Sequence, residues 1–306
     1  MSHSMFKTDE IKTLRISSYL NFVCNRAGIE LTGYQFERYF EPEKVIRDEA
    51  TKAVKRSCKY DRYIYKSVCP NHDTAMLIES KTSGSIELLY SPIWRVLDCI
   101  VSGNELNSSI EELHLVVQQE LLKSKRDSTN HYVRKSISTT SLENLMKAGD
   151  LHGLCGLLIL LFGTDRTLLK PSRLSVEKRL FEMLVNIAAA EYPTEVIWNI
   201  YQCYFPYLPR RTSRKELTFD EFKFKVAQKN KLLTLATNKG HIMFFEERCR
   251  FLNLMFSGDC QLIKRELKLP GNALINRGEK VRNLFWLVKR LNTLRPYGDR
   301  RRFIYN

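Results

Sequence analysis

The residues LCGLLILLF, from Leu154 to Phe162, are the longest apolar run of the chain and decide its class of fold. The run is too short to cross a bilayer as a helix, which takes about 20 residues. Gly163 follows it directly, as glycine often follows the end of a helix. We therefore expect a helix that is buried on all sides, and the rest of the chain must supply the elements that cover it.

Helical patterns lie on both sides of this run. Residues 175–190 repeat apolar side chains at helical spacing, with Leu180, Leu184 and Ile187 facing inward. Residues 9–26 show a similar pattern near the N-terminus. The sequence therefore predicts a mainly α, multi-helix protein.

The stretch from residue 60 to residue 90 has a different pattern, with a period of two. The segment YDRYIYKSV would place Tyr63 and Tyr65 on one face of a strand. Two further segments, 75–81 and 86–90, flank a short turn rich in serine and glycine and predict a hairpin. We therefore expect a small antiparallel β element around residues 60–90.

The composition is that of a globular protein, with 43% hydrophobic and 27% charged residues. The opening residues MSHSMFKTDEIKTL are polar and charged, so we expect no secretory signal. The 8 cysteines form no CxxC pair, and most of them fall in apolar helical patterns. These observations predict reduced core cysteines in a cytoplasmic protein, with no membrane among its partners.

The charge is unevenly distributed along the chain. Residues 201–306 hold 23 lysines and arginines against 9 acidic residues, which is a net charge of +14 out of +15 for the whole chain. The segment YFPYLPRRTSRKE, with two prolines and a run of bases, is the best candidate for a linker. We therefore expect a near-neutral domain at 1–207, mixed α/β and then helical, and a basic helical domain at 208–306.

Three groups of basic residues in the second domain are candidates for contacts with phosphates. The first follows the prolines, the second lies on a helix that would be the second helix of a helix-turn-helix or winged helix, and the third is a tail with aromatic neighbours. The candidate residues are Arg210, Arg211, Arg214, Lys215, Arg277, Lys280, Arg282, Arg295, Arg300, Arg301 and Arg302. Nucleic acid, DNA or RNA, is the first partner that this charge predicts.

One helix of this basic third has a predictable register. Thr218 and Glu221 have the spacing of a capping box, and Phe222 begins an apolar stripe. Phe222 and Phe224 flank Lys223, with further lysines behind them. In an amphipathic helix we expect the lysines on the outer face and most of the aromatic rings in the core.

A ribonuclease is one alternative to a binding protein. The residues from Arg126 to His131 have the Arg-x4-His spacing of HEPN-type ribonucleases, and the chain resembles that family in these six residues. The resemblance implies that Arg126 steadies the charge of the scissile phosphate while His131 moves a proton. The competing interpretation is a solvated loop.

A metal-dependent nuclease of the PD-(D/E)xK kind is a second enzymatic alternative. It needs an acid on one strand and an acid-x-Lys on the neighbouring strand, so that the acids hold a divalent metal and the lysine helps to activate water. Asp61, Glu79 and Lys81 have a suitable order on the predicted strands. Exposed strands also carry such residues without any catalytic role.

A zinc site would need Cys58, Cys69 and His72, with Cys24 as a fourth ligand, although buried free cysteine is the simpler interpretation. No cofactor is predicted beyond zinc or a divalent metal. The main hypothesis is a nucleic-acid-binding, non-catalytic subunit of a larger intracellular complex that includes other protein subunits. The alternatives are a nuclease and a helical scaffold that docks an acidic protein. Whether the protein is an enzyme is left open.

Overall fold

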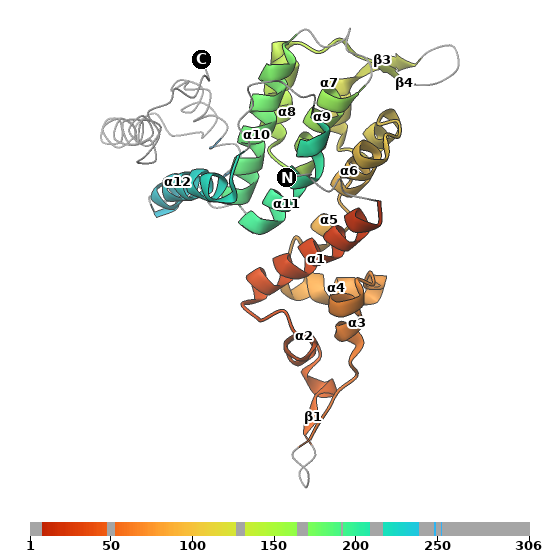
Figure 1. The fold of residues 1–306 in the computed structure, drawn as a ribbon, viewed down its shortest axis with the longest axis vertical. Helices are drawn as coiled ribbons and strands as arrows, with labels where there is room; N and C mark the ends of the chain where they lie inside the picture. The colour runs from red at the N-terminus through yellow and green to blue at the C-terminus, as the bar shows by residue number, and fades with distance from the viewer. Residues whose placement is uncertain are drawn as a thin grey trace, which may run out of the picture.

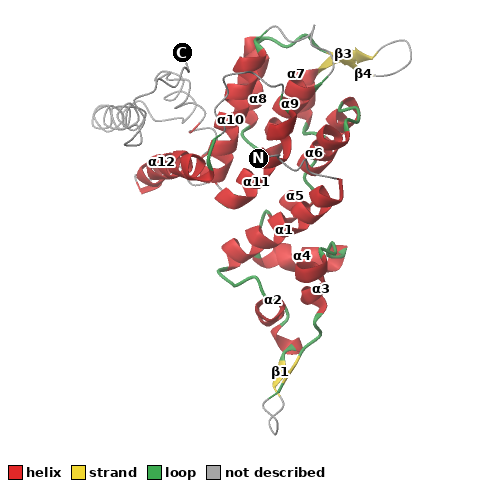
Figure 2. Cartoon of the chain, viewed as in Figure 1, coloured by secondary structure: helices red, strands yellow, loops and turns green. Residues whose placement is uncertain are grey.

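The computed structural model describes residues 8–47, 53–126, 132–163, 171–190, 192–208 and 217–238, together with Arg248 and Leu252. These residues form an elongated, mostly helical molecule (Figures 1 and 2), which confirms the mainly α prediction. The elements are α1 (Thr8–Ala27), α2 (Gly33–Phe40), η1 (Pro42–Lys44), β1 (Ile46–Arg47), β2 (Val54–Lys55), α3 (Lys59–Lys66), α4 (His72–Lys81), α5 (Ser85–Leu89), α6 (Ile93–Ser102), η2 (Asn107–Glu112), α7 (Leu115–Leu121), β3 (Leu122–Arg126), β4 (Tyr132–Arg134), α8 (Thr139–Ala148), α9 (Leu151–Phe162), α10 (Arg173–Ala190), α11 (Thr194–Tyr204), η4 (Phe205–Tyr207) and α12 (Phe219–Asn238).

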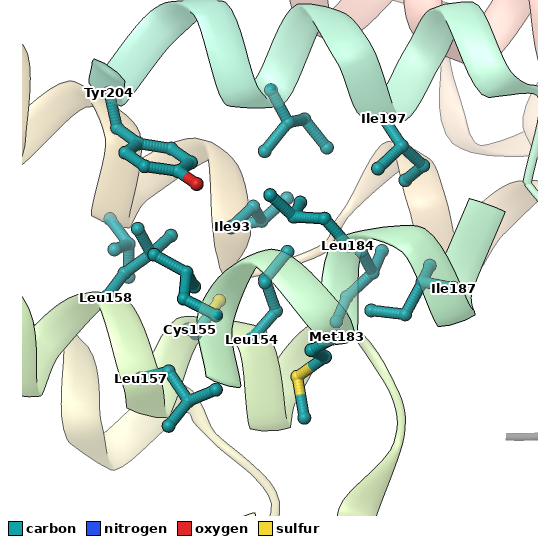
Figure 3. Close-up of a cluster of buried hydrophobic side chains, with 14 of the residues drawn as sticks. Ile93, Leu154, Cys155, Leu157, Leu158, Met183, Leu184, Ile187, Ile197 and Tyr204 are labelled. Atoms are coloured by element: carbon teal, nitrogen blue, oxygen red, sulfur yellow. The ribbon is translucent and has the colours of Figure 1, made fainter. Parts of the chain in front are cut away.

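Helix α9 contains the apolar run and is the centre of the larger of two cores, as expected. All of its residues from Leu151 to Leu161 are buried, and it packs against α6, α7, α8 and α10. Figure 3 shows its side chains interleaved with those of α6, α10 and α11, including Leu184 and Tyr204. Asp150 caps the helix by accepting a hydrogen bond of 2.8 Å from the Gly153 amide.

A second, smaller core lies below α1 in Figure 1 and is rich in aromatic rings. Its buried aromatic side chains come from α1, α2 and α3 and are Tyr19, Phe36, Phe40, Tyr60 and Tyr63. Aromatic pairs at centroid distances of 5.7–6.3 Å, such as Phe36 with Tyr60, hold α2 against α3. Burial of these large rings gives this end of the molecule a core of its own.

Helix α1 belongs to both cores. Leu14 and Phe22 are buried in the larger core, whereas Tyr19 and Val23 are buried in the smaller one. Its contacts with α6 and α11 on one side and with α3 on the other agree with its position between the two groups of helices in Figure 1. The two cores are therefore joined through a helix that is apolar on two sides.

The predicted position of the β element is wrong. Residues 60–90 fold as α3, α4 and α5, while small antiparallel hairpins form elsewhere, from β1 with β2 and from β3 with β4. A helix suits α3 because Tyr60 and Tyr63, three residues apart, can both enter the smaller core. The buried pair therefore has the spacing of a helix, and Tyr65, which a strand would have placed on the same face as Tyr63, points outward.

Helix α12 lies beyond the predicted domain boundary but packs against α10 and α11. Its residues Phe222, Val226 and Leu233 belong to the larger core. The division of the chain at residues 207 and 208 stays a prediction. No helix within the part of the chain that the structure describes has the length and the apolar character needed to cross a membrane.

Candidate nucleic-acid interface

Helix α12 makes up most of the chain that the structure describes beyond residue 208, where the other described residues are Leu217, Thr218, Arg248 and Leu252. A reciprocal capping box precedes it, which confirms the prediction. The Glu221 amide donates to the Thr218 hydroxyl at 3.2 Å, and the Thr218 amide donates to the Glu221 carboxylate at 3.0 Å. This box starts the helix at Phe219 and thereby sets which face each later side chain occupies.

The inner face of α12 is held by aromatic contacts. Phe222 is fully buried, with its ring 5.5 Å from that of Trp198 on α11 and 6.2 Å from that of Phe181 on α10. Lys229 also turns toward α10, where its ammonium group lies 3.6 Å from the Glu182 carboxylate. These contacts fix the rotation of the helix about its own axis.

The outer face combines lysines with an aromatic ring. Lys223, Lys225 and Lys231 are exposed, and Phe224 leaves 42% of its surface in solvent. Phe222 therefore lies in the core, as expected for most of the rings, and Phe224 is an exception. Phe224 and Lys231, two turns apart, lie on the side opposite the buried stripe.

The charges of this face are only partly neutralised. Lys223 lies 3.5 Å from the exposed carboxylate of Asp220 and 4.5 Å above the ring of Phe219. Lys231 has no ion-pair partner among the residues that the structure describes. An exposed ring offers a surface for a base to stack on, and the ammonium groups on the same helix can neutralise phosphates.

The basic residues predicted from the sequence to contact phosphates lie outside the described residues. This holds for the predicted helix-turn-helix or winged helix and for the basic tail as well. The residues concerned are Arg210, Arg211, Arg214, Lys215, Arg277, Lys280, Arg282, Arg295, Arg300, Arg301 and Arg302. Their roles stay predictions.

The residues of the HEPN-like spacing belong to the hairpin of β3 and β4. Arg126 is the last residue of β3 and pairs with Tyr132 of β4. His131 lies outside the described residues. The structure therefore places Arg126 on a strand, and the proposed action of the pair on a phosphate stays a prediction.

The strands proposed for a metal-dependent nuclease are helices, so the strand arrangement that this hypothesis assumed is wrong. Asp61 lies on α3, while Glu79 and Lys81 lie on α4. The Arg56 guanidinium lies 2.9 Å from the Asp61 carboxylate. Lys81 donates a hydrogen bond of 2.7 Å to the Tyr39 carbonyl at the end of α2. Asp61 and Lys81 thus each hold neighbouring segments together.

Glu79 also has a structural partner, because it caps α5. Its carboxylate accepts hydrogen bonds of 2.8 Å from the amides of Gly84 and Ile86 and from the Ser85 hydroxyl. Burial alone would raise the pKa of Glu79, but these hydrogen bonds outweigh it and lower the pKa. The group is thereby held as a carboxylate at the N-terminus of a helix.

The proposed zinc ligands lie around α3 and the start of α4. Cys58 and Cys69 are exposed free cysteines, and His72 is the first residue of α4. Within the described ranges, no group of three or more His, Cys, Asp or Glu side chains is arranged to hold a metal ion. These three residues therefore have no zinc-binding geometry in the structure.

A pair of stacked histidines is a feature that the sequence did not reveal. The rings of His114 and His152 lie 3.5 Å apart, and His114 Nδ1 lies 3.2 Å from the Asp150 carboxylate. The His114 amide donates to His152 Nδ1 at 3.1 Å, so this nitrogen is unprotonated. Burial lowers the pKa of His152, the neighbouring His114 lowers it further, and Asp150 opposes both effects.

Comparison of the chain with protein-family models, with curated proteins and with solved structures gives no significant match. The function of this chain is therefore inferred from its own charge and geometry.

Proposed function

We propose that the protein binds nucleic acid, DNA or RNA, through its basic C-terminal third and serves as a non-catalytic subunit of a larger complex. The observation that carries the proposal is the concentration of charge, with 23 lysines and arginines against 9 acidic residues in 201–306. A net positive charge of this size attracts polyanions, and binding then releases the counterions that surround their phosphates.

The outer face of α12 supports the proposal. Many basic proteins carry charge without a binding role, so the side chains that accompany the charge also matter. On α12, however, Lys223, Lys225 and Lys231 accompany the exposed ring of Phe224. Proteins that bind nucleic acid without reading its sequence commonly combine these two kinds of side chain.

Salt dependence tests the proposal. Binding of fluorescein-labelled duplex DNA and of labelled RNA to the full chain is followed by fluorescence anisotropy at increasing salt concentrations. We expect binding to weaken steeply with salt, with a slope in log K against log salt of roughly −0.9 for each duplex phosphate contacted. A variant with Arg300, Arg301 and Arg302 changed to Ala should bind more weakly and have a shallower slope, and so should one with Lys223, Lys225 and Lys231 changed to Ala.

The control variant removes the same number of charges from the near-neutral part of the chain. Lys12, Lys147 and Lys178 are exposed residues of α1, α8 and α10, and their joint change to Ala should leave the slope unchanged. An absence of DNA and RNA binding at low salt would refute the proposal. Capture of an acidic protein in its place would favour the scaffold, and RNA cleavage that is lost in His131→Ala would favour the nuclease.

A further inference from the structure

The outer face of α3 carries a second combination of ring and charge. Arg62, Tyr65 and Lys66 stand at positions i, i+3 and i+4, so they share one side of the helix. All three are exposed, and Tyr65 leaves 71% of its surface in solvent. This is the largest exposed fraction among the large hydrophobic side chains that the structure describes.

The positive charges of this face are available to a ligand. Other bases near α3 have acidic partners, since Arg56 pairs with Asp61 and Lys59 pairs with Glu41. Arg62 and Lys66 make no ion pair with any residue that the structure describes. An anion that approaches Tyr65 would therefore meet two cations that are not already neutralised.

The opposite face of α3 is packed in the smaller core. Tyr60 and Tyr63 are buried in the smaller core, and the Tyr60 hydroxyl donates a hydrogen bond of 2.9 Å to the buried Glu41. The helix is flanked by Cys58 and Ser67, which both adopt the left-handed backbone conformation that residues other than glycine rarely adopt. The backbone that carries Tyr65 is thus in place before a ligand binds, so presenting the ring needs no rearrangement of the helix.

We propose that the outer face of α3 binds single-stranded nucleic acid, with an unpaired base stacked on Tyr65 and the adjacent phosphates neutralised by Arg62 and Lys66. This inference rests on the proposed function, but it names a separate surface and the class of nucleic acid that this surface binds. Stacking on a side chain requires a base whose face is uncovered, which single strands offer and the interior of a duplex does not. DNA and RNA share this chemistry.

Tyrosine substitutions test the stacking. The full chain is titrated into short fluorescein-labelled oligothymidylate and oligouridylate and into a blunt duplex. Tyr65→Ala should weaken binding of both single strands by at least about fivefold, which is the lower end of what one stacked base contributes. Tyr65→Phe keeps the ring and should bind as wild type does, as should the control Met76→Ala, which trims an exposed side chain of α4. Duplex binding should not change in any of these variants.

The charge substitutions give an independent measurement. Changing Arg62 and Lys66 to Ala should reduce the salt slope for the single strands by roughly 0.7 for each phosphate contact that is lost. If wild type binds the probes but Tyr65→Ala binds single strands as tightly as wild type, only this inference fails. Equal weakening for duplex and single strands would overturn the single-strand assignment. If wild type binds no probe at low salt, the proposed function fails as well.

Discussion

Two phenylalanines of α12, two residues apart, should have opposite effects on stability and binding. Phe222 is fully buried between Phe181 and Trp198, whereas Phe224 leaves 42% of its surface exposed beside the lysines of the outer face. Replacement of each by Ala removes the same atoms from the same helix. Any difference between the two variants therefore reports on the environment of each ring and not on helix propensity.

The magnitudes follow from burial. Truncation of a buried phenylalanine leaves a cavity, and Phe222→Ala should lower the free energy of unfolding by about 3–5 kcal/mol. The Phe224 ring is roughly half covered, so Phe224→Ala should cost about 1 kcal/mol or less. If a base stacks on Phe224, its loss should weaken binding to single strands by about 1–3 kcal/mol, which is fivefold or more in Kd.

Urea unfolding followed by circular dichroism measures the first quantity, and fluorescence anisotropy with oligothymidylate measures the second. Phe224→Tyr is the matched control, because it keeps an exposed ring and should keep wild-type affinity. The reasoning would be refuted if Phe224→Ala were as unstable as Phe222→Ala. It would also be refuted if Phe224→Ala were stable but bound the probe as tightly as wild type does.

Two further predictions concern the cores. A Cβ at Gly153 would meet the Leu145 carbonyl at 2.7 Å, so Gly153→Ala should lower the stability by about 1–2 kcal/mol in urea unfolding, because this backbone clash outweighs the gain in helix propensity. At Gly156 the new Cβ meets only side-chain atoms at 3.0 Å, so Gly156→Ala should stay within about 1 kcal/mol of wild type, and equal losses in both variants would contradict this account. Burial alone would raise the pKa of Glu41, but hydrogen bonds from lysine and tyrosine neighbours lower this pKa from 4.5 to about 2. The ionised carboxylate therefore stabilises the folded state by at most about 3 kcal/mol before solvent screening. This contribution is present above pH 4.5 and is lost as the pH falls toward 2. Urea unfolding at neutral pH and between these two values should show this loss in wild type and a smaller loss in Glu41→Gln, and an equal loss in both would show that Glu41 is not its source.

The helices that could be predicted are those in which apolar spacing is unambiguous. The run that ends at Phe162 could only be buried, and Leu180, Leu184 and Ile187 identify the inner face of α10. Residues 60–90 were ambiguous, because short aromatic-rich segments satisfy the spacing of a strand and of a helix alike. What favours the helix at Tyr60 is contact with Glu41 and with the rings of α2, which no local pattern contains.

The two candidate surfaces, on α12 and on α3, also differ in how far the sequence alone could locate them. The outward direction of Phe224 follows from the capping box and the buried stripe, so the register of α12 contains it, although the expectation that most rings lie in the core did not single it out. Tyr65 was missed because the period-two interpretation placed it on the same face as Tyr63. The contact between His114 and His152 joins residues 38 positions apart, and no local signal predicts such a pair.

The position of α1 restricts how these surfaces can be studied. One side of α1 completes the larger core, which holds α12, and the other side completes the smaller core, which holds α3. A chain cut between the two cores would leave one part without α1 and expose an apolar side of that helix in the other, at a cost of about 25 cal/mol for each Å² uncovered. Truncation would thus confuse loss of folding with loss of binding, so point substitutions on exposed faces of the intact chain are the informative changes. Because one helix packs into both cores, a single strand that reached both Phe224 and Tyr65 would bind two surfaces held on a common scaffold.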